Sequence, residues 1–474
     1  MLNPEALQQQ RGNNRALSPP LKRSVLPPAP GQIEQAPNPA PNALQRLAFL
    51  AGLATIFVKL TVLPELLVTF LGVNTYLLWI VSPPALFGAL FTGAIGRTLR
   101  QKPARWFLWF FLWMMIGLPF SSWVGGSVPE FRYYAQNSFP LMFVFGGLAL
   151  VWSEVRSTFI TIGLAGVFII GAARFLALNG DDGRMQMTSA SSTIGNENDL
   201  ASHLIFVLPF VLFIALDRRI NRFLRILLVA PIAFGIFVIF ATASRGGLVS
   251  LCVCFLFVLF RGSARQRMSA IVVGGVLALA IPFLLSGSNA LDRLGSLFGG
   301  QHEEAKESGD SRDYLLRQSI IFTAQHPVFG VGLFQFPNFE GRTSISAGVR
   351  GNWHETHNAV TQVSSECGVP AVIFFALAIG TALTSVNRIY GQARREGYTE
   401  IANASFCYLL SSVGYLASII FLSNAYRFYL PVMIGLAVAL TVSAQKEMSR
   451  NRPVNFVSTG WMPPVAARRP LAHS

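Results

Sequence analysis

A histidine and an asparagine, His357 and Asn358, stand where a polar stretch of the sequence enters a long apolar run. Small residues follow at spacings that share one face of a helix, namely Thr361, Ser364, Ser365 and Gly368. Because small residues let neighbouring helices approach closely, His357 should be held at the end of a tightly packed helix. A histidine there can titrate near neutral pH and act as a base. The same pattern also fits a histidine that only anchors the helix at a membrane surface.

The letters around this histidine, HETHN, invite comparison with a zinc site. The zinc-binding H-E-x-x-H motif places its two histidines one helical turn apart, with the glutamate beside them. Here only Thr356 separates Glu355 from His357, so the spacing differs. His354 and His357 could still bind a metal as a pair, but the sequence shows no third ligand beside them. We therefore expect no metal and no cofactor.

Arginines supply the second type of chemistry. Arg245 follows an apolar run in ATASRGGL, while Arg312 opens a helix-like stretch and Arg317 follows one and a half turns later. The guanidinium group binds phosphate through paired hydrogen bonds and does not lose its charge. These residues therefore indicate a site for a lipid phosphate or diphosphate, although simple headgroup contact would explain any one of them. Gly246 and Gly247 beside Arg245 permit a close approach of the backbone.

Membrane-spanning helices must position these residues. Of the 474 residues, 52% are hydrophobic and only 12% are charged, whereas soluble domains carry about 25% charged residues. The net charge of +15 could indicate a nucleic-acid partner. However, the Lys and Arg residues stand in short clusters between apolar runs, which is the pattern of the positive-inside rule. We therefore expect membrane lipids, and no nucleic acid, as partners.

The apolar runs predict an all-α polytopic membrane protein with about twelve transmembrane helices between residues 44 and 444. The predicted spans are 44–62, 75–95, 106–124, 136–152, 157–177, 199–216, 223–242, 246–261, 268–286, 358–386, 404–422 and 428–444. Proline-rich residues 1–43 predict a disordered tail, and residues 445–474 a second polar tail.

Orientation follows from four basic clusters. They are Arg97, Arg100, Lys102 and Arg105; Arg218, Arg219, Arg222 and Arg225; Arg261, Arg265 and Arg267; and Arg388, Arg394 and Arg395. With twelve spans, all four fall on the side of both tails, which is therefore predicted to be cytoplasmic. One long loop, 287–357, is then expected on the opposite side, with His357 at its end.

Four pieces of the sequence resemble the O-antigen ligase and O-antigen polymerase family of membrane glycosyltransferases. GNENDLASHLIFVLP (195–209) is similar to the family's entry to a span, and TASRGGLVSL (242–251) to its Ser-Arg-Gly turn. SRDYLLRQSIIFTAQHPVFGVGLFQF (311–336) is similar to its Arg-led helix and Gly-rich run. HNAVTQVSSECGVPA, from 357, resembles its His-Asn pattern, although Ala371 departs from the usual closing residue. The resemblance covers about 195–371.

The resemblance implies a C-type membrane glycosyltransferase of the bacterial cytoplasmic membrane. Such an enzyme transfers a glycan from undecaprenyl diphosphate to an acceptor hydroxyl, such as a lipid-core sugar, at the periplasmic face. It implies His357 as the base or acceptor-orienting group, and Arg245 and Arg312 as diphosphate ligands. Arg317 and Asn358 are lesser candidates. Glu366 is a further candidate, as a buried partner in the same helix.

Two other functions stay open. Between ligase and polymerase we favour a ligase, because the arginines look like one patch for one donor. A polymerase holds two lipid diphosphates, and Arg342 and Arg350 in the loop could supply a second patch. A secondary transporter is the alternative of another class, although the sequence shows no repeat of two similar halves.

Overall fold

The computed structural model describes residues 43–179, 185–187, 194, 196–284, 303–348 and 350–450. The tail predicted at 1–43 lies outside them except for its last residue. Of the tail predicted at 445–474, residues 445–450 continue the last helix and the rest lies outside. The described chain is helical apart from one short pair of strands, so the all-α prediction holds for nearly all of it.

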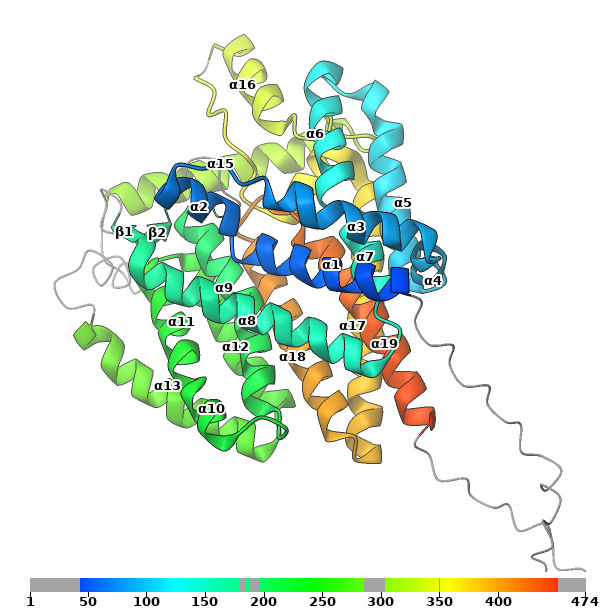
Figure 1. Cartoon of the computed structure of the whole chain (residues 1–474). Helices are drawn as coiled ribbons and strands as arrows, with labels where there is room; N and C mark the ends of the chain where they lie inside the picture. The colour runs from blue at the N-terminus through cyan, green and yellow to red at the C-terminus, as the bar shows by residue number, and fades with distance from the viewer. Residues whose placement is uncertain are drawn as a thin grey trace, which may run out of the picture. The chain divides into compact units, whose positions relative to one another are not determined.

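The first half of the chain forms helices of very different length (Figure 1). They are α1 (Ala43–Leu60), α2 (Leu63–Leu71), α3 (Leu77–Phe91), α4 (Ala94–Leu99), α5 (Lys102–Gly117), the 3₁₀ turn η3 (Leu118–Phe120), α6 (Val124–Asn137), α7 (Leu141–Gly147) and α8 (Trp152–Leu176). A two-stranded antiparallel pair follows, formed by β1 (Ala177–Asn179) and β2 (Met185–Met187).

The second half holds the longer helices and the predicted functional residues. They are α9 (Glu197–Leu216), α10 (Arg222–Leu227), α11 (Val229–Ala241), α12 (Arg245–Arg261), α13 (Ala264–Leu284), α15 (Glu303–Gln325), α16 (Phe336–Ser346), α17 (Ala359–Glu396), α18 (Thr399–Ile419) and α19 (Tyr429–Arg450).

Within the described residues, seven helical segments are long and apolar enough to cross a membrane. They are Ala43–Leu60, Lys102–Phe120, Trp152–Ala173, Glu197–Leu216, Arg222–Ala241, Ala359–Glu396 and Tyr429–Arg450. Each coincides with a predicted span, so a polytopic membrane protein is confirmed, whereas the predicted number of twelve is not.

Three of the five remaining predicted spans differ for identifiable reasons. The span at 75–95 becomes α3 with only 15 residues, and the span at 136–152 becomes α7 with seven. Helix α18 has 21 residues, but serine, tyrosine and asparagine side chains lower its hydropathy. Most of its residues are buried inside the bundle, where contact with lipid does not set the composition.

Helix α9 lies at the centre of the bundle. Its sequence is apolar on every face, and it packs against both α8 and α18. Helix α17 contacts α5, α18 and α19, and α12 packs on α18. These neighbours bring the three segments with the predicted functional residues to the same group of helices.

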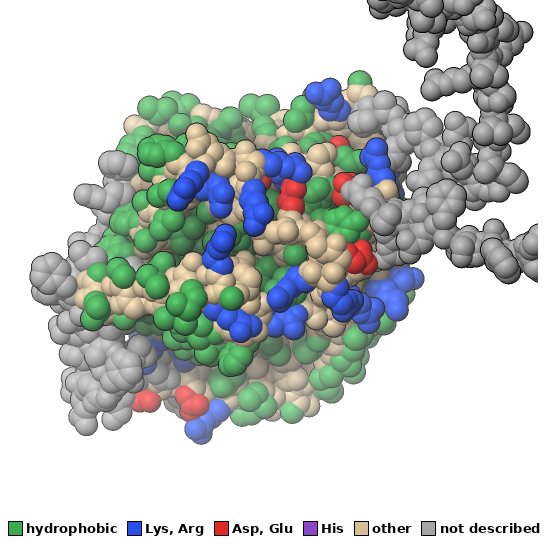
Figure 2. All heavy atoms as spheres, turned by 90° about the horizontal axis from the view of Figure 1, so that it is seen from below, with side chains coloured by type: hydrophobic (Ala, Val, Ile, Leu, Met, Phe, Trp, Pro, Cys, Tyr) green, Lys and Arg blue, Asp and Glu red, His purple; other side chains and the backbone are tan. Residues whose placement is uncertain are grey.

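One end of this group is basic. Arg219, after α9, pairs with Glu400 of α18 over 2.7 Å. The Tyr390 hydroxyl of α17 donates to the carbonyl of Arg261, at the end of α12, over 2.6 Å. Three of the four basic clusters therefore share one end, at the bottom of Figure 1, and Figure 2 shows Lys and Arg gathered on that face. The arrangement follows the charge pattern that predicted a cytoplasmic side.

The segment predicted as a long loop, 287–357, contains two helices where it is described. α15 packs along α17, and α16 joins it around a small core of Leu315, Phe322, Val331 and Phe336. The buried carboxylate of Glu340 accepts hydrogen bonds from the backbone N–H groups of Asn352 and Trp353. The described part of this segment, residues 303–348 and 350–357, is thus a structured cap on the bundle and not an irregular connection.

Helix α17 is broken where this cap meets it. Gly368 has φ 82° and ψ 174°, and a Cβ atom there would lie 2.1 Å from the Val328 carbonyl oxygen. The break frees the carbonyls of Ser365 and Glu366, which accept hydrogen bonds from Val331 at 2.7 Å and Gly332 at 3.0 Å. The Gly-rich run at 326–336 therefore satisfies backbone groups that a continuous helix would satisfy itself.

Candidate active site at the helix N-termini

His357 lies in a tight turn directly before α17. Its φ is +51°, a left-handed conformation that is uncommon for a residue with a side chain. Its backbone N–H donates to Ser423 Oγ over 2.8 Å, and Thr356 Oγ1 lies 3.3 Å from the same oxygen. The turn between α18 and α19 thus holds the histidine in place.

Asn358 is the N-cap of α17. Its side-chain oxygen accepts from the backbone N–H groups of Val360 at 2.9 Å and Thr361 at 3.1 Å. An N-cap of this kind contributes about 0.5–2 kcal/mol to helix stability. The structure therefore gives Asn358 a definite task in positioning its neighbour His357, while its predicted contact with substrate stays a prediction.

Arg245 begins α12, beside the N-terminus of α9. Ser244, the N-cap of α12, accepts from Gly247 N–H over 3.1 Å and donates to Asn198 Oδ1 over 2.7 Å. A Cβ atom on Gly246 would lie 2.8 Å from the Cβ of Phe421. The Ser-Arg-Gly turn is therefore closely packed, as the glycines predicted, and the Arg245 side chain is exposed at its edge.

Arg312 of α15 reaches this turn from the cap. It lines a narrow cleft together with Asn198, Ser244 and Gly246. Burial lowers the pKa of the half-buried Arg312 guanidinium, the charge of Arg245 lowers it further, and Glu197 acts in the opposite direction. Two arginines far apart in the sequence thus face the same small region.

The electrostatics of His357 tie it to the same region. Burial lowers the pKa of the half-buried imidazole to about 4, and the charges of Arg312 and His354 contribute. The imidazole is therefore neutral at physiological pH, which is the form that can accept a proton. His357 and Arg245 come from different segments, and Arg312 of a third segment lies within electrostatic reach of both.

Two other predicted residues lie elsewhere. Arg317 pairs with Asp313 one turn away on α15 over 2.8 Å, and both side chains are exposed. Glu366 is buried and accepts from Phe334 N–H over 3.1 Å, with Tyr426 as a further partner. The Glu366 side chain thus anchors the Gly-rich run to α17.

The turn between α18 and α19 holds residues to which sequence reasoning gave no role. Asn424 donates to Asp199 Oδ1 over 3.1 Å, and Arg427 donates to Asn424 Oδ1 over 3.4 Å. Arg427 and Asp199 also act on the Glu355 carboxylate. The available signal was a polar stretch, SNAYR, between two apolar runs.

Several helices begin beside the residues described above, so the positive ends of their dipoles lie in the same region. The N-caps are Asn196 for α9, Ser244 for α12 and Asn358 for α17. Helix N-termini and arginines together favour a bound anion. Among the described residues, no group of three or more His, Cys, Asp or Glu side chains is arranged to hold a metal ion.

Residues 230–376 of the chain match a family model described as O-Antigen ligase. The matched stretch begins in α11 and ends in α17 beyond the break, so it contains Arg245, Arg312 and His357. The piece at 195–209 that resembles the same family lies outside it. None of the curated proteins compared with the chain matches it.

Proposed function

We propose that this chain, whose residues 230–376 match the O-Antigen ligase family model, is a membrane glycosyltransferase of the O-antigen ligase/polymerase family that uses a glycan linked to undecaprenyl diphosphate. In this proposal the acceptor is a hydroxyl group of a lipid-core sugar at the periplasmic face of the bacterial cytoplasmic membrane. Both termini are then cytoplasmic. The family match supports ligase-type glycan transfer. The identity of the donor, the identity of the acceptor and the orientation in the membrane are our proposals.

One observation carries the proposal: Arg312 lines the same cleft as Ser244 and Gly246, the two neighbours of Arg245 in the chain, and its charge acts on both Arg245 and His357. The pair of guanidinium groups offers donors in the fork geometry that suits phosphate oxygens. Glu197, Asp199 and Glu355 lie nearby, so the region is not uniformly positive. Two adjacent cations beside a neutral base are what a diphosphate leaving group and an acceptor hydroxyl require.

The proposed reaction is a single displacement at the anomeric carbon of the donor sugar. The acceptor oxygen forms a new bond to this carbon while the bond between the carbon and the diphosphate oxygen breaks. The electron pair of the broken bond leaves with undecaprenyl diphosphate. The acceptor proton passes to the His357 imidazole. Arg245 and Arg312 stabilise the charge that develops on the diphosphate. The anomeric configuration is inverted, and the step needs neither ATP nor a metal ion.

Binding of the glycan donor would also change the pKa of His357, the proposed base. In the free protein the charge of Arg312 contributes to the lowered pKa of His357. A diphosphate bound to Arg312 opposes that charge, so the pKa of His357 should rise toward its ordinary value. The histidine would thus become a better proton acceptor when the donor is in place.

The direct test is transfer by purified full-length protein from a glycan on undecaprenyl diphosphate to a lipid-core acceptor. The parent should give product with or without a chelator, and His357→Ala should give none while it still inserts and binds donor. His354→Ala is the matched control, because His354 is exposed three residues away, and it should keep transfer. Full activity of His357→Ala would reduce His357 to an anchor. Loss of transfer on addition of a chelator, with recovery on addition of zinc, would instead favour a metal at His354 and His357. Absence of transfer by the parent protein would favour a transporter.

A deletion strain separates ligase from polymerase. Full-length polymer on undecaprenyl diphosphate, with the lipid core unmodified, is the expected result for a ligase. Single repeat units on the carrier would show a polymerase. Arg342 and Arg350, exposed on the cap, would then be the first candidates for a second diphosphate.

A further inference from the structure

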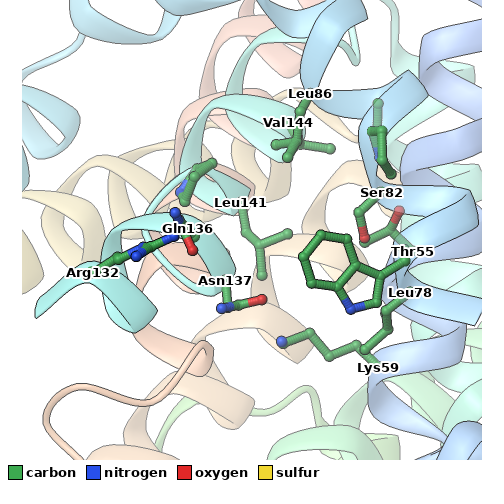
Figure 3. Close-up of a pocket in the computed structure, with 14 residues that line it drawn as sticks. Thr55, Lys59, Leu78, Ser82, Leu86, Arg132, Gln136, Asn137, Leu141 and Val144 are labelled. Carbon is green, nitrogen blue, oxygen red and sulfur yellow. The ribbon is translucent and has the colours of Figure 1, made fainter. Parts of the chain in front are cut away.

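A separate cavity of about 570 Å³ lies between the first helices of the chain, away from the residues of the match. Helices α1 and α3 form one wall, and α6 with the start of α7 forms the other (Figure 3). Its volume is typical of a pocket that binds a small ligand. None of the residues assigned to glycan transfer lines it.

The cavity is basic at one end. Lys59 extends into it from α1, Arg132 borders it from α6, and the side chains of Gln136 and Asn137 lie between them (Figure 3). The described residues that line it include no Asp or Glu. Glu65 is the one acidic group that acts on Lys59. The lining thus offers two cations and two amides to an anion.

The rest of the lining is apolar and continues onto a lipid-facing surface. Leu86 of α3 and Val144 of α7 close the cavity, opposite the basic end. Along α3, Trp79, Ile80, Phe87 and Phe91 are all more than half exposed. Lys59 lies in the last turn of α1, where a long cationic side chain can reach a phosphate group at the membrane interface. The Lys59 ammonium also lies 5.0 Å from the centre of the Phe428 ring, which carries no charge.

We propose that this cavity binds the phosphate-bearing headgroup of a membrane lipid, with the phosphate at Lys59 and Arg132 and the lipid chains along α3. Arginine and lysine hold phosphate oxygens, and the amides of Gln136 and Asn137 can donate to them. The apolar wall and the exposed face of α3 favour a lipid over a free phosphate. Phe428, which contacts Lys59, follows Arg427 in the α18–α19 turn, so the bound lipid lies beside the turn that carries the other site.

Native mass spectrometry of the full-length protein, released from nanodiscs of phosphatidylcholine with phosphatidylglycerol, tests this proposal. The parent should retain phosphatidylglycerol preferentially, and Lys59→Gln and Arg132→Gln should each lower retention about tenfold, since each removes a charged contact. Arg105→Gln changes the net charge equally at an exposed position on α5, and it should retain lipid like the parent. Arg132 is also exposed, so Arg132→Gln should fold normally. If Lys59→Gln does not fold, lipid retention by Arg132→Gln alone tests the proposal.

Two results would overturn the proposal. Parental retention in the Lys59→Gln/Arg132→Gln double variant would place the lipid elsewhere. Displacement of the lipid by glycerol 3-phosphate or inorganic phosphate at equal concentration would show a site for soluble phosphate. The measurement needs no glycan transfer, so its outcome is independent of the proposed enzyme activity.

Discussion

Ser423 accepts the backbone hydrogen bond of His357 from a turn that is 66 residues away in the sequence. His357 has a left-handed backbone conformation, which costs on the order of 1–3 kcal/mol. Such a conformation persists only where neighbouring residues hold it in place. Ser423 and the adjacent Thr356 hydroxyl supply that support. The position of the proposed base therefore depends on the α18–α19 turn as well as on its own helix.

Ser423→Ala should lower the rate constant of transfer about tenfold, while donor binding stays close to that of the parent. The substitution removes the acceptor of the His357 N–H, a contact typically worth about 1 kcal/mol, and loosens the turn. Steady-state kinetics with purified protein would show the change in kcat. Ser346→Ala, at an exposed hydroxyl that bonds only along its own helix, should leave kcat unchanged. An equal fall in both variants would argue against a positioning role.

The pH dependence of transfer should have two different acid limbs. The neutral imidazole of His357 is the active form, so activity falls as pH drops through its pKa. In the free protein, burial and Arg312 lower this pKa to about 4, and the limb in kcat/KM reports this state. The limb in kcat reports the donor complex and should lie at higher pH, because the diphosphate opposes the charge of Arg312. Arg312→Gln should move the kcat/KM limb upward; a downward shift would contradict the proposed coupling.

Arg245→Lys and Arg312→Lys should each weaken donor binding tenfold or more despite keeping the charge. A guanidinium group binds phosphate through two parallel bonds and an ammonium group does not, and such contacts are worth about 1.5–3 kcal/mol. Binding of undecaprenyl diphosphate to the purified variants measures the effect. Arg317→Lys serves as the control, since Arg317 is exposed and paired with Asp313, and it should bind like the parent. If all three variants bind equally well, these arginines only meet headgroups.

Gly368→Ala should destabilise the protein by about 2 kcal/mol or more. The positive φ is strained for alanine, and the added Cβ would collide with the Val328 carbonyl oxygen. Gly380→Ala provides a close comparison on the same helix, because its Cβ would meet nothing within 4 Å. It should be neutral or stabilising by about 0.5–1 kcal/mol. Thermal unfolding in detergent would separate the two, and equal melting temperatures would show that the break tolerates a side chain.

Cysteine labelling of intact cells tests the orientation. Ser308→Cys, in α15 of the cap, should react with an impermeant reagent, and Ser449→Cys, near the end of α19, should not. The expectation rests on the basic loops, which gather at the opposite end of the bundle from His357. The reverse labelling pattern would invert the proposed topology.

The residues proposed for the site could be picked out from the sequence, and their role stays a prediction. His357, Arg245 and Arg312 were recognisable because each stands at the polar end of an apolar run, and the structure brings them together. Helix α18, predicted as a span at 404–422, shows why the number of spans is not confirmed: its serine, tyrosine and asparagine side chains lower its hydropathy, although most of its residues are buried inside the bundle. Asp199 and Asn424 were not predicted as partners, because their contact joins residues 225 positions apart. The cavity at Lys59 likewise depends on how α1 packs beside α6 and α7, which no local pattern contains.

The break in α17 limits replacement of the cap by a cap from another protein. The carbonyl of Cys367 accepts from the Trp113 indole over 3.1 Å, as those of Ser365 and Glu366 accept from the Gly-rich run. An unpaired carbonyl costs several kcal/mol in a bilayer, so the bundle without its cap would be a poorly satisfied structure. Grafting a cap from a relative should therefore succeed only if its Gly-rich run and the matching part of α17 are transferred together. Substitutions within the cap should preserve these hydrogen bonds more readily than replacement of the whole cap.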